Sequence, residues 1–128
     1  MDDCGQLLRE IQQYHVENVG LWDIAPNFLI GGDGKAYEGR GWDFSGVFVT
    51  RFNIKSLGIS FIGNFDEELP SAAQISAYNE LLKIGIGMFK MTEYYRVMAQ
   101  GQFLNDTRSP GNAFYKSIKN WENWLSDI

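Results

Sequence analysis

The sequence predicts an α/β fold in which three helices flank a small mixed central β-sheet. Two patterns support this. Apolar residues recur at helical spacing in three separate segments, and short apolar runs bounded by glycine-rich turns lie between them. Along the 128 residues the order is helix, hairpin, strand, helix, strand, helix. The length suits one domain, and no linker, repeat or low-complexity tract interrupts it.

The first half of the chain predicts a helix, a hairpin and a strand. An amphipathic helix is expected over residues 5–17, with an apolar side formed by Leu7, Leu8, Ile11, Tyr14 and His15. The stretch "PNFLIGGDGKAYEGRGW" indicates two strands joined by a "GGDG" turn, which is a hairpin signal. The nearly continuous apolar run "SLGISFIGNF" is typical of a strand that helices bury on both faces.

The second half predicts a helix, a short strand and a last helix. In "PSAAQISAYNELLKIG", Ser71 and Gln74 form a capping-box pattern and Gly85 is a plausible end. One helical face is then expected from Ala72, Ile75, Tyr78 and Leu82. The run "YYRVMA" reads as a strand, and Ser109 with Pro110 predicts the start of the last helix. Its apolar side would hold Phe114, Ile118, Trp121 and Leu125.

Charge and composition exclude several classes of protein. The net charge of −5, with no basic run, argues against a nucleic-acid partner and against anionic membrane surfaces. Neither a signal peptide nor a transmembrane run is recognisable in the chain, so its cellular location is not predicted from the residues. A single cysteine, Cys4, cannot form an internal disulfide.

Reactive side chains are few. His15 is the only histidine, and its position on the apolar side of a helix indicates a hydrogen-bonded side chain that is either in the core or half-buried. Cys4 lies eleven positions away, and a zinc site requires three or four such ligands. No GxSxG motif is present, and "GGDGKAYEGRG" lacks the ending and the following helix of a phosphate loop. We therefore predict no catalytic residue, no metal and no cofactor.

Two segments nevertheless have the composition of a binding site. "GRGWDFSGVFVTRF" combines Arg40, which can form paired bonds to a carboxylate, with Trp42 and Phe44, which offer flat apolar contact. Packing of both aromatics in the core or at a rim is an equally good interpretation. The second segment, "YRVMAQGQFLNDTRSPG", has polar side chains and sharp-turn glycines but no His, no Cys and no close carboxylate pair.

Three longer phrases resemble the peptidoglycan recognition protein family, particularly its insect members. They are "IQQYHVENVGLWDIAPNFLIGGDGKAYEGRGWDFSG", "SLGISFIGNF" and "TRSPGNAFYKSIKNWENW", and the match runs from about Cys4 to Trp124. The resemblance implies the zinc amidase fold, and residues 1–128 would form one such domain lacking its N-terminal part and first strand. It also implies a groove for the stem peptide and muramyl sugar of peptidoglycan, and a role in innate immunity.

The same resemblance implies that the domain is not an enzyme. In enzymatic members two His and one Cys hold zinc and a Tyr assists. The second His position falls on Gln100, the Cys position on Ser109 and the Tyr position on Pro26, while the first His would precede Cys4. Thr107 survives, without a metal to assist. A family disulfide would also place the partner of Cys4 upstream, so Cys4 is expected to be a free thiol.

The resemblance also suggests a ligand. Arg40 matches an Arg associated with the extra carboxylate of meso-diaminopimelate (DAP). The companion Gly-Trp pair reads Gly20-Leu21, and Phe48 replaces a groove His. The expected ligand-binding residues are Gly20, Leu21, Pro26, Arg40, Trp42, Phe44, Phe48, Gln100, Thr107, Arg108 and Ser109.

The resemblance leaves two functions and a location open. The expected partners are bacterial peptidoglycan or its muropeptides, with the DAP type favoured, and other peptidoglycan recognition proteins, by homo- or hetero-association. The alternative is a regulator or decoy that binds no peptidoglycan and acts only through such pairing. Members of the family are mostly secreted or are membrane-receptor ectodomains.

Overall fold

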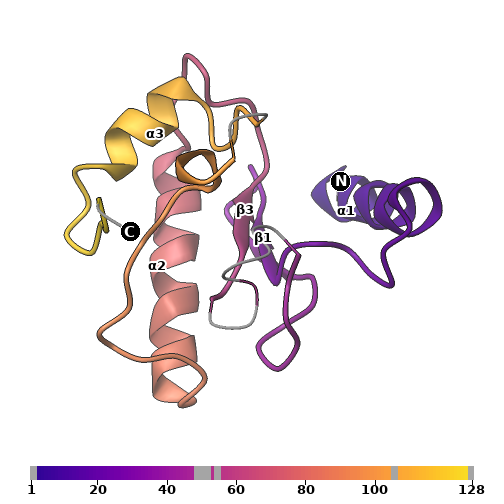
Figure 1. The fold of residues 1–128 in the computed structure, drawn as a ribbon, viewed down its shortest axis with the longest axis horizontal. Helices are drawn as coiled ribbons and strands as arrows, with labels where there is room; N and C mark the ends of the chain where they lie inside the picture. Colours follow the sequence, from indigo (N-terminus) through magenta and orange to yellow (C-terminus); the bar gives the residue numbers. More distant parts are fainter. Residues whose placement is uncertain (1–2, 48–52, 54–55, 105–106, 127–128) are drawn as a thin grey trace.

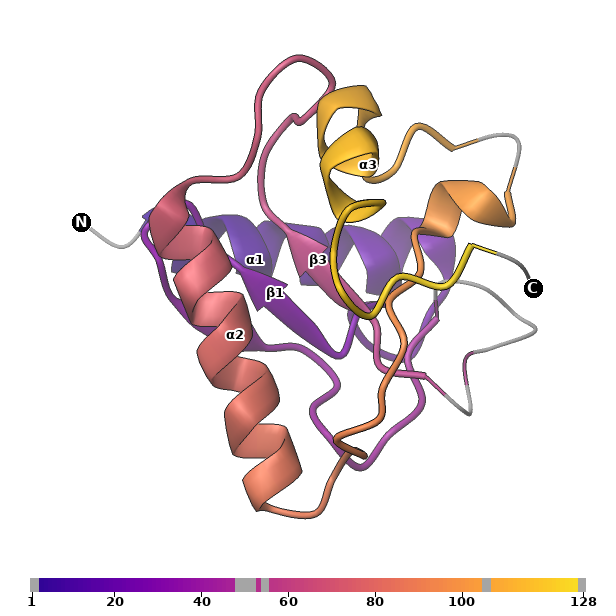
Figure 2. The same cartoon turned by 90° about the vertical axis from the view of Figure 1, so that its left-hand side faces the viewer.

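The computed structural model describes residues 3–47, 53, 56–104 and 107–126. In this part of the chain the sheet lies between two helices, α1 on one face and α2 on the other (Figures 1 and 2). None of the described helices is long and apolar enough to cross a membrane. The elements in chain order are α1 (Asp3–Tyr14), the π-helical turn η1 (His15–Val19), β1 (Phe28–Ile30), β2 (Ala36–Glu38), β3 (Ile59–Phe61), α2 (Ala72–Gly87), the 3-10 turn η2 (Gln100–Gln102) and α3 (Asn112–Ile118).

The described strands form a three-stranded mixed sheet in the order β2-β1-β3. β1 pairs antiparallel with β2, which confirms the hairpin, and parallel with β3. The strand predicted in "SLGISFIGNF" is also confirmed, but its burial on both faces is wrong, because Ser60 is exposed and Ile59 and Phe61 are only partly buried. The fully covered strand is β1, which occupies the centre of this sheet.

The helix predicted over residues 5–17 is confirmed and is slightly longer than expected. α1 continues directly into η1, and the helical run ends at Gly20, which has a left-handed φ of +87°. Glycine suits this position because it has no Cβ to oppose a left-handed backbone. Near the other end, Cys4 is a free, partly buried thiol whose sulfur lies against Gly31 at the end of β1.

α2 begins as predicted and ends later than predicted. Ser71 and Gln74 form both bonds of the capping box. Gly85 does not end the helix, which continues to Gly87. Gly85 is buried, because the Trp42 ring occupies the position that a Cβ at Gly85 would take. The predicted apolar face is also partly wrong, since Ala72 is exposed. The buried side chains are Gln74, Tyr78, Leu81 and Leu82, with Gly85.

The C-terminal part differs most from prediction. The strand predicted in "YYRVMA" is wrong, because its backbone makes only one isolated bridge, between Val97 and Trp124. The predicted helix start at Ser109 and Pro110 is also wrong: α3 begins at Asn112 after Gly111. The backbone N–H groups of Ala113 and Phe114 donate to the Phe65 carbonyl at 3.1 and 3.2 Å, so docking on the segment after β3 sets the start of this helix.

The core consists of two connected apolar clusters. The larger lies between β1 and α2, and the smaller packs α3 on Phe65. Phe61 and Trp121 contact both clusters and join them. Burial raises the pKa of Tyr78 far above its usual range, and the nearby Tyr95 adds to the shift. The Tyr78 hydroxyl therefore stays protonated and neutral, and its ring packs against those of Phe61 and Trp121.

Candidate functional site

Arg40 follows β2 and holds two separate segments of backbone. Its Nε donates to the carbonyl of Ile24 at 2.7 Å, and its Nη2 donates to the carbonyl of Asp23 at 3.3 Å. Its Nη1 donates to the carbonyl of Ser45 at 3.2 Å. The side chain thus ties the turn of residues 20–25 to the loop of residues 41–47. Among the described residues no carboxylate forms an ion pair with Arg40, so no local anion neutralises its charge.

His15 supports the same turn from the end of α1. The Ala25 N–H donates to His15 Nδ1 at 3.0 Å, so in the neutral ring the proton resides on Nε2. Burial lowers the pKa of His15, and the positive charge of Arg40 lowers it further. The predicted hydrogen-bonded histidine is confirmed, and its side chain is half-buried. The Asp23 carboxylate adds a further tie by accepting from its neighbour Ile24 and from Gln12, at 2.7 and 2.8 Å.

Asn27 is the polar centre of this region, and our sequence interpretation missed it. Its side chain is only 1% exposed. Its Nδ2 donates to the carbonyls of Gly41 and Phe44 at 3.0 and 2.7 Å, and its Oδ1 accepts from the Gly58 N–H at 2.8 Å. The sequence signal that could have identified Asn27 is an amide residue directly before the wholly apolar strand β1, since a buried amide needs hydrogen-bond partners.

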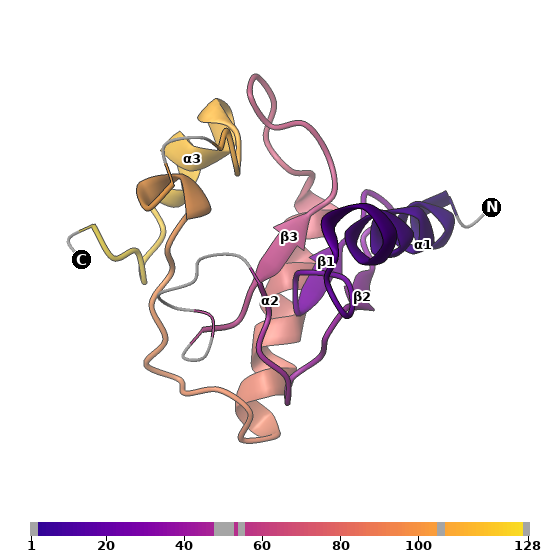
Figure 3. The ribbon, with the colours of Figure 1, turned by 45° about the vertical axis from the view of Figure 1, so that its right-hand side comes forward.

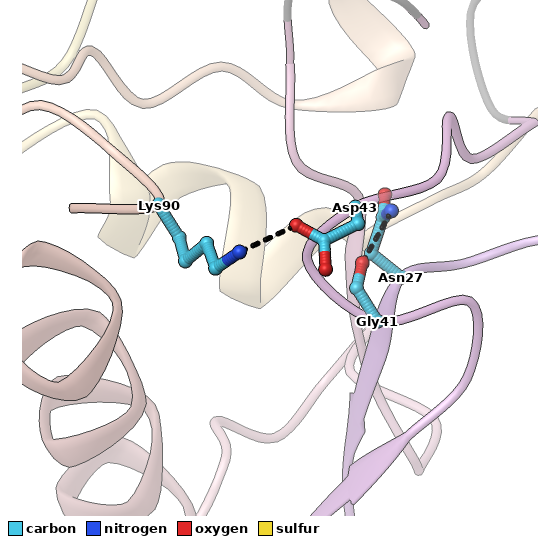
Figure 4. Close-up of polar contacts among 4 residues, drawn as sticks. All are labelled: Asn27, Gly41, Asp43 and Lys90. Carbon is cyan, nitrogen blue, oxygen red and sulfur yellow. Dashed lines mark hydrogen bonds and ion pairs between the residues drawn. The ribbon is translucent and has the colours of Figure 1, made fainter. Parts of the chain in front are cut away.

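An ion pair ties the same loop to the end of α2. Lys90 Nζ lies 2.7 Å from Asp43 Oδ1, and Figure 4 shows this pair beside the bond from Asn27 to Gly41. Within the loop, Val47 N–H donates to the Ala25 carbonyl at 2.9 Å, which joins it directly to the turn of residues 20–25. Loop 41–47 is therefore held by side chains and backbone from three other parts of the chain.

The structure separates the two aromatics of the "GRGWDF" segment. Trp42 packs in the core, with its ring centroid 4.6 Å from that of Phe28 and its edge against Gly85. Phe44 is 73% exposed. Trp22, in the turn that Arg40 holds, is 96% exposed and is a surface residue that our sequence interpretation left out of the site.

The remaining predicted residues near Arg40 are placed differently from one another. Gly20 is exposed at the end of η1, and Leu21 is partly buried and donates its N–H to the His15 carbonyl at 2.9 Å. Pro26 is buried, and its carbonyl accepts from the Arg40 backbone N–H at 3.1 Å. Phe48 lies outside the residues that the structure describes.

The other predicted residues lie in η2 and in the loop between η2 and α3. Gln100 begins η2, and the Gly101 N–H donates to the Ser109 carbonyl at 3.0 Å, which brings the two ends of this loop together. Ser109 N–H donates to Thr107 Oγ1 at 3.1 Å. Ser109 and Arg108 are exposed. Figure 3 shows η2 and α3 on the β3 side of the sheet, whereas Arg40 follows β2 at the opposite edge.

Comparison with known proteins identifies the family. The family model for N-acetylmuramoyl-L-alanine amidase matches residues 2–112. A peptidoglycan recognition protein of Trichoplusia ni is 39% identical over 124 residues, which cover 97% of this chain and 68% of that protein. The chain belongs to the peptidoglycan recognition protein family. It covers 68%, 63% and 61% of the lengths of three curated relatives, and so spans only part of each.

Solved structures of peptidoglycan recognition proteins agree with this fold. Peptidoglycan recognition protein-LE, in complex with tracheal cytotoxin, a monomeric DAP-type peptidoglycan, matches with a TM-score of 0.89 and 41% identity over 94% of this chain and 70% of that one. The ectodomain complex of recognition proteins LCa and LCx, bound to the same fragment, matches at 0.90 and 41% over 95% and 73%. The predicted family and the predicted mixed sheet with flanking helices are thus confirmed.

The residues of this chain do not fit the zinc that the amidase fold implies. Zinc in such sites takes Cys, His or carboxylate ligands. Two of the three positions expected to hold it fall on the amide of Gln100 and the hydroxyl of Ser109. In the part of the chain that the structure describes, no group of three or more His, Cys, Asp and Glu could hold a metal ion.

Proposed function

We propose that this chain is a non-catalytic peptidoglycan recognition domain of innate immunity that binds DAP-type muropeptides. The observation that carries the proposal is Arg40, a cation fixed by three backbone carbonyls and not ion-paired to any described carboxylate. Two similar structures are complexes of recognition proteins with a DAP-type fragment, which supports this choice of ligand.

The geometry of Arg40 suits recognition of an anionic group. A DAP residue carries one carboxylate that a lysine residue at the same place lacks, so a fixed cation can distinguish the two stem peptides. The three carbonyls orient the guanidinium before any ligand arrives, which lowers the entropy lost when a carboxylate binds. The exposed ring of Phe44, next to Ser45, offers an apolar face for a sugar or a peptide stem.

The absence of catalysis is part of this proposal and rests on three replaced positions. Gln100 and Ser109 offer no imidazole and no thiolate, and Pro26 has no hydroxyl group in place of the assisting Tyr. Purified protein should contain no stoichiometric zinc and should leave the muramoyl–alanine amide intact. Zinc at one equivalent together with amide cleavage would overturn this part.

Calorimetric titration with a DAP-type muropeptide, and separately with a lysine-type one, tests the ligand. The wild type should prefer the DAP-type ligand, and Arg40→Ala should lose about tenfold or more in affinity for it, because a charged hydrogen-bond partner is removed. Arg9→Ala is the control, since Arg9 is exposed on α1 and bonds only within that helix among the described contacts. An Arg40→Ala protein that binds the DAP-type ligand like wild type would refute the assignment.

A second candidate function is a regulator that binds no peptidoglycan and pairs with other recognition proteins. It is supported by buried Pro26, which removes a polar groove position, and by the similar LCa–LCx complex, in which two recognition proteins assemble. Sedimentation should then show self-association or hetero-pairing with no response to either muropeptide. Under both functions we propose that the domain is secreted or forms part of a receptor ectodomain.

A further inference from the structure

The two most exposed aromatic side chains near Arg40 are each adjacent in sequence to a residue that Arg40 holds. Trp22 precedes Asp23 and is 96% exposed; Phe44 precedes Ser45 and is 73% exposed. Exposed Trp and Phe side chains supply large contact areas at recognition surfaces. Because one guanidinium bonds both backbone segments, its position sets how these segments are spaced.

We propose that Arg40 is the positioning residue of this surface: it holds turn 20–25 against loop 41–47, so that Trp22 and Phe44 are presented together to the ligand. This deepens the proposed function and rests on it for the identity of the ligand. The role is separate from reading a carboxylate by charge, since a mobile cation could provide charge alone.

The three bonds explain why an arginine is needed here. Each leaves from a different nitrogen: Nε to Ile24, Nη2 to Asp23 and Nη1 to Ser45. The planar fork of a guanidinium fixes these directions, whereas the donors of a lysine all share one nitrogen. Arg40→Lys therefore keeps the positive charge and loses the simultaneous hold on both segments, which separates positioning from charge.

Other contacts limit what the substitution should disturb. Asn27 still holds the carbonyls of Gly41 and Phe44, and His15 still accepts from Ala25. The fold should therefore survive in Arg40→Lys, with loosening limited to turn 20–25 and loop 41–47, including the bond between them from Val47 N–H to the Ala25 carbonyl.

Amide hydrogen exchange on the unliganded chain tests the positioning directly. In Arg40→Lys, peptides covering residues 20–25 and 41–47 should exchange about tenfold faster than in wild type, because charge-assisted bonds are lost. Peptides from α2 should be unchanged, which reports an intact fold, and Arg9→Lys should match wild type throughout. Unchanged exchange at Val47 and in turn 20–25 of Arg40→Lys would overturn the proposal.

Calorimetry with the two muropeptides then tests the consequence for binding. Positioning predicts that Arg40→Lys loses a similar factor, about tenfold, for DAP-type and lysine-type ligands, because both meet the same displaced aromatics. Trp22→Ala and Phe44→Ala should weaken both ligands while leaving exchange in the partner segment unchanged. An Arg40→Lys protein with wild-type affinity for both ligands would contradict the role.

The exchange and calorimetry experiments together distinguish this proposal from the proposed function. If wild type binds neither muropeptide, the proposed function fails and the contact role of Trp22 and Phe44 fails with it. Faster exchange in Arg40→Lys would still establish Arg40 as the tie between the two segments, and unchanged exchange would refute that tie as well.

Discussion

Two loops carry five of the eleven residues expected to meet a ligand, and different kinds of contact hold these loops. Loop 41–47 is held mainly by side chains that reach it from elsewhere: Asn27, Arg40 and Lys90. Among its described residues, the loop between η2 and α3 is held mainly by its own backbone, through the bond from Gly101 to Ser109 and a bond of 2.6 Å from the Gly111 N–H to the Arg108 carbonyl; the Thr107 hydroxyl adds one side-chain bond.

This difference predicts that side chains can be replaced more freely in the loop between η2 and α3 than in loop 41–47. Exposed side chains at Arg108 and Ser109 do not form the backbone bonds that shape their loop, so they can be replaced while the shape persists. In loop 41–47 the shape depends on particular side chains. The backbone bonds of the loop between η2 and α3 therefore do not require particular side chains at Arg108 and Ser109.

The largest expected effect comes from removing the side chain of Asn27. In Asn27→Ala the Gly58 N–H and the carbonyls of Gly41 and Phe44 each lose a buried partner. Unfulfilled buried polar groups are costly, so the free energy of unfolding should fall by about 3 kcal/mol or more in urea denaturation.

Ser109→Ala is the matched test on the other loop. The exposed Ser109 shapes its loop through its backbone, so the loss should stay within about 0.5 kcal/mol. Asn79→Ala, at an exposed position of α2, controls for the loss of an amide side chain as such. Equal losses in Asn27→Ala and Ser109→Ala would break the comparison between the two loops.

The next largest effect concerns the way loop 41–47 rests on α2. A Cβ at Gly85 would lie 2.4 Å from the nearest atom of the Trp42 ring. Gly85→Ala should therefore lower the free energy of unfolding by about 1–3 kcal/mol, despite the better helix propensity of alanine.

Gly87→Ala provides the control in the same helix. No atom lies within 4 Å of a Cβ built at Gly87, so this variant should be neutral or slightly more stable, by about 0.5 kcal/mol. If thermal or urea unfolding gave both variants the same stability, the close contact between Trp42 and α2 would not contribute to holding loop 41–47.

The comparison also shows what the sequence could predict. The helix over residues 5–17, the hairpin around "GGDG" and the capping box at Ser71 follow from short-range patterns, and all three are present. The family phrases predicted the overall fold. Local patterns are reliable here because turn glycines, caps and helical periodicity act over a few residues.

The errors arose where distant residues decide the local structure. Gly85 resembles a helix end until Trp42, far away in sequence, is seen against it. The start of α3 depends on Phe65, and the partial exposure of β3 depends on which strand occupies the centre of the sheet. In the candidate site, the charge of Arg40 was evident from the sequence, but its three carbonyl partners required the fold.

A smaller effect is expected from pH, through His15. Burial and Arg40 depress the pKa of His15 in the folded chain, so between that pKa and the ordinary value of 6.5 the unfolded chain binds more protons. Stability is therefore full above about pH 6.5 and falls as the pH decreases through the folded pKa. The loss should be smaller than in the preceding variants, because the ring is only half-buried.

His15→Asn isolates this titration. The amide oxygen of asparagine can accept from the Ala25 N–H as Nδ1 does, but it does not titrate. Urea unfolding of wild type between pH 7.5 and 5.5 should show the loss of stability, and His15→Asn should show a flatter profile. Since His15 is the only histidine, parallel profiles would mean that its neutral form does not support the turn.

The smallest effect is expected for the ion pair between Asp43 and Lys90, the third side-chain tie of loop 41–47. The Lys90 side chain is 34% exposed and that of Asp43 68%, so water screens the pair only in part. A double-mutant cycle with Asp43→Ala and Lys90→Ala should give a coupling of about 0.5–1 kcal/mol that weakens with added salt.

The pair of Glu80 and Lys83 within α2 is the matched control for that cycle. It is longer, at 3.5 Å, and more exposed, at 64% and 75%, so its coupling should be about 0.3 kcal/mol or less. A larger coupling for Asp43 and Lys90 would show that the ion pair adds to the hold on the loop. Equal couplings would mean that Asn27 and Arg40 hold the loop without help from the ion pair. Added salt should not weaken the hydrogen bonds of the neutral Asn27 amide or of the Arg40 guanidinium to the backbone carbonyls. Loop 41–47 would then remain ordered at ionic strengths that screen the attraction between Asp43 and Lys90.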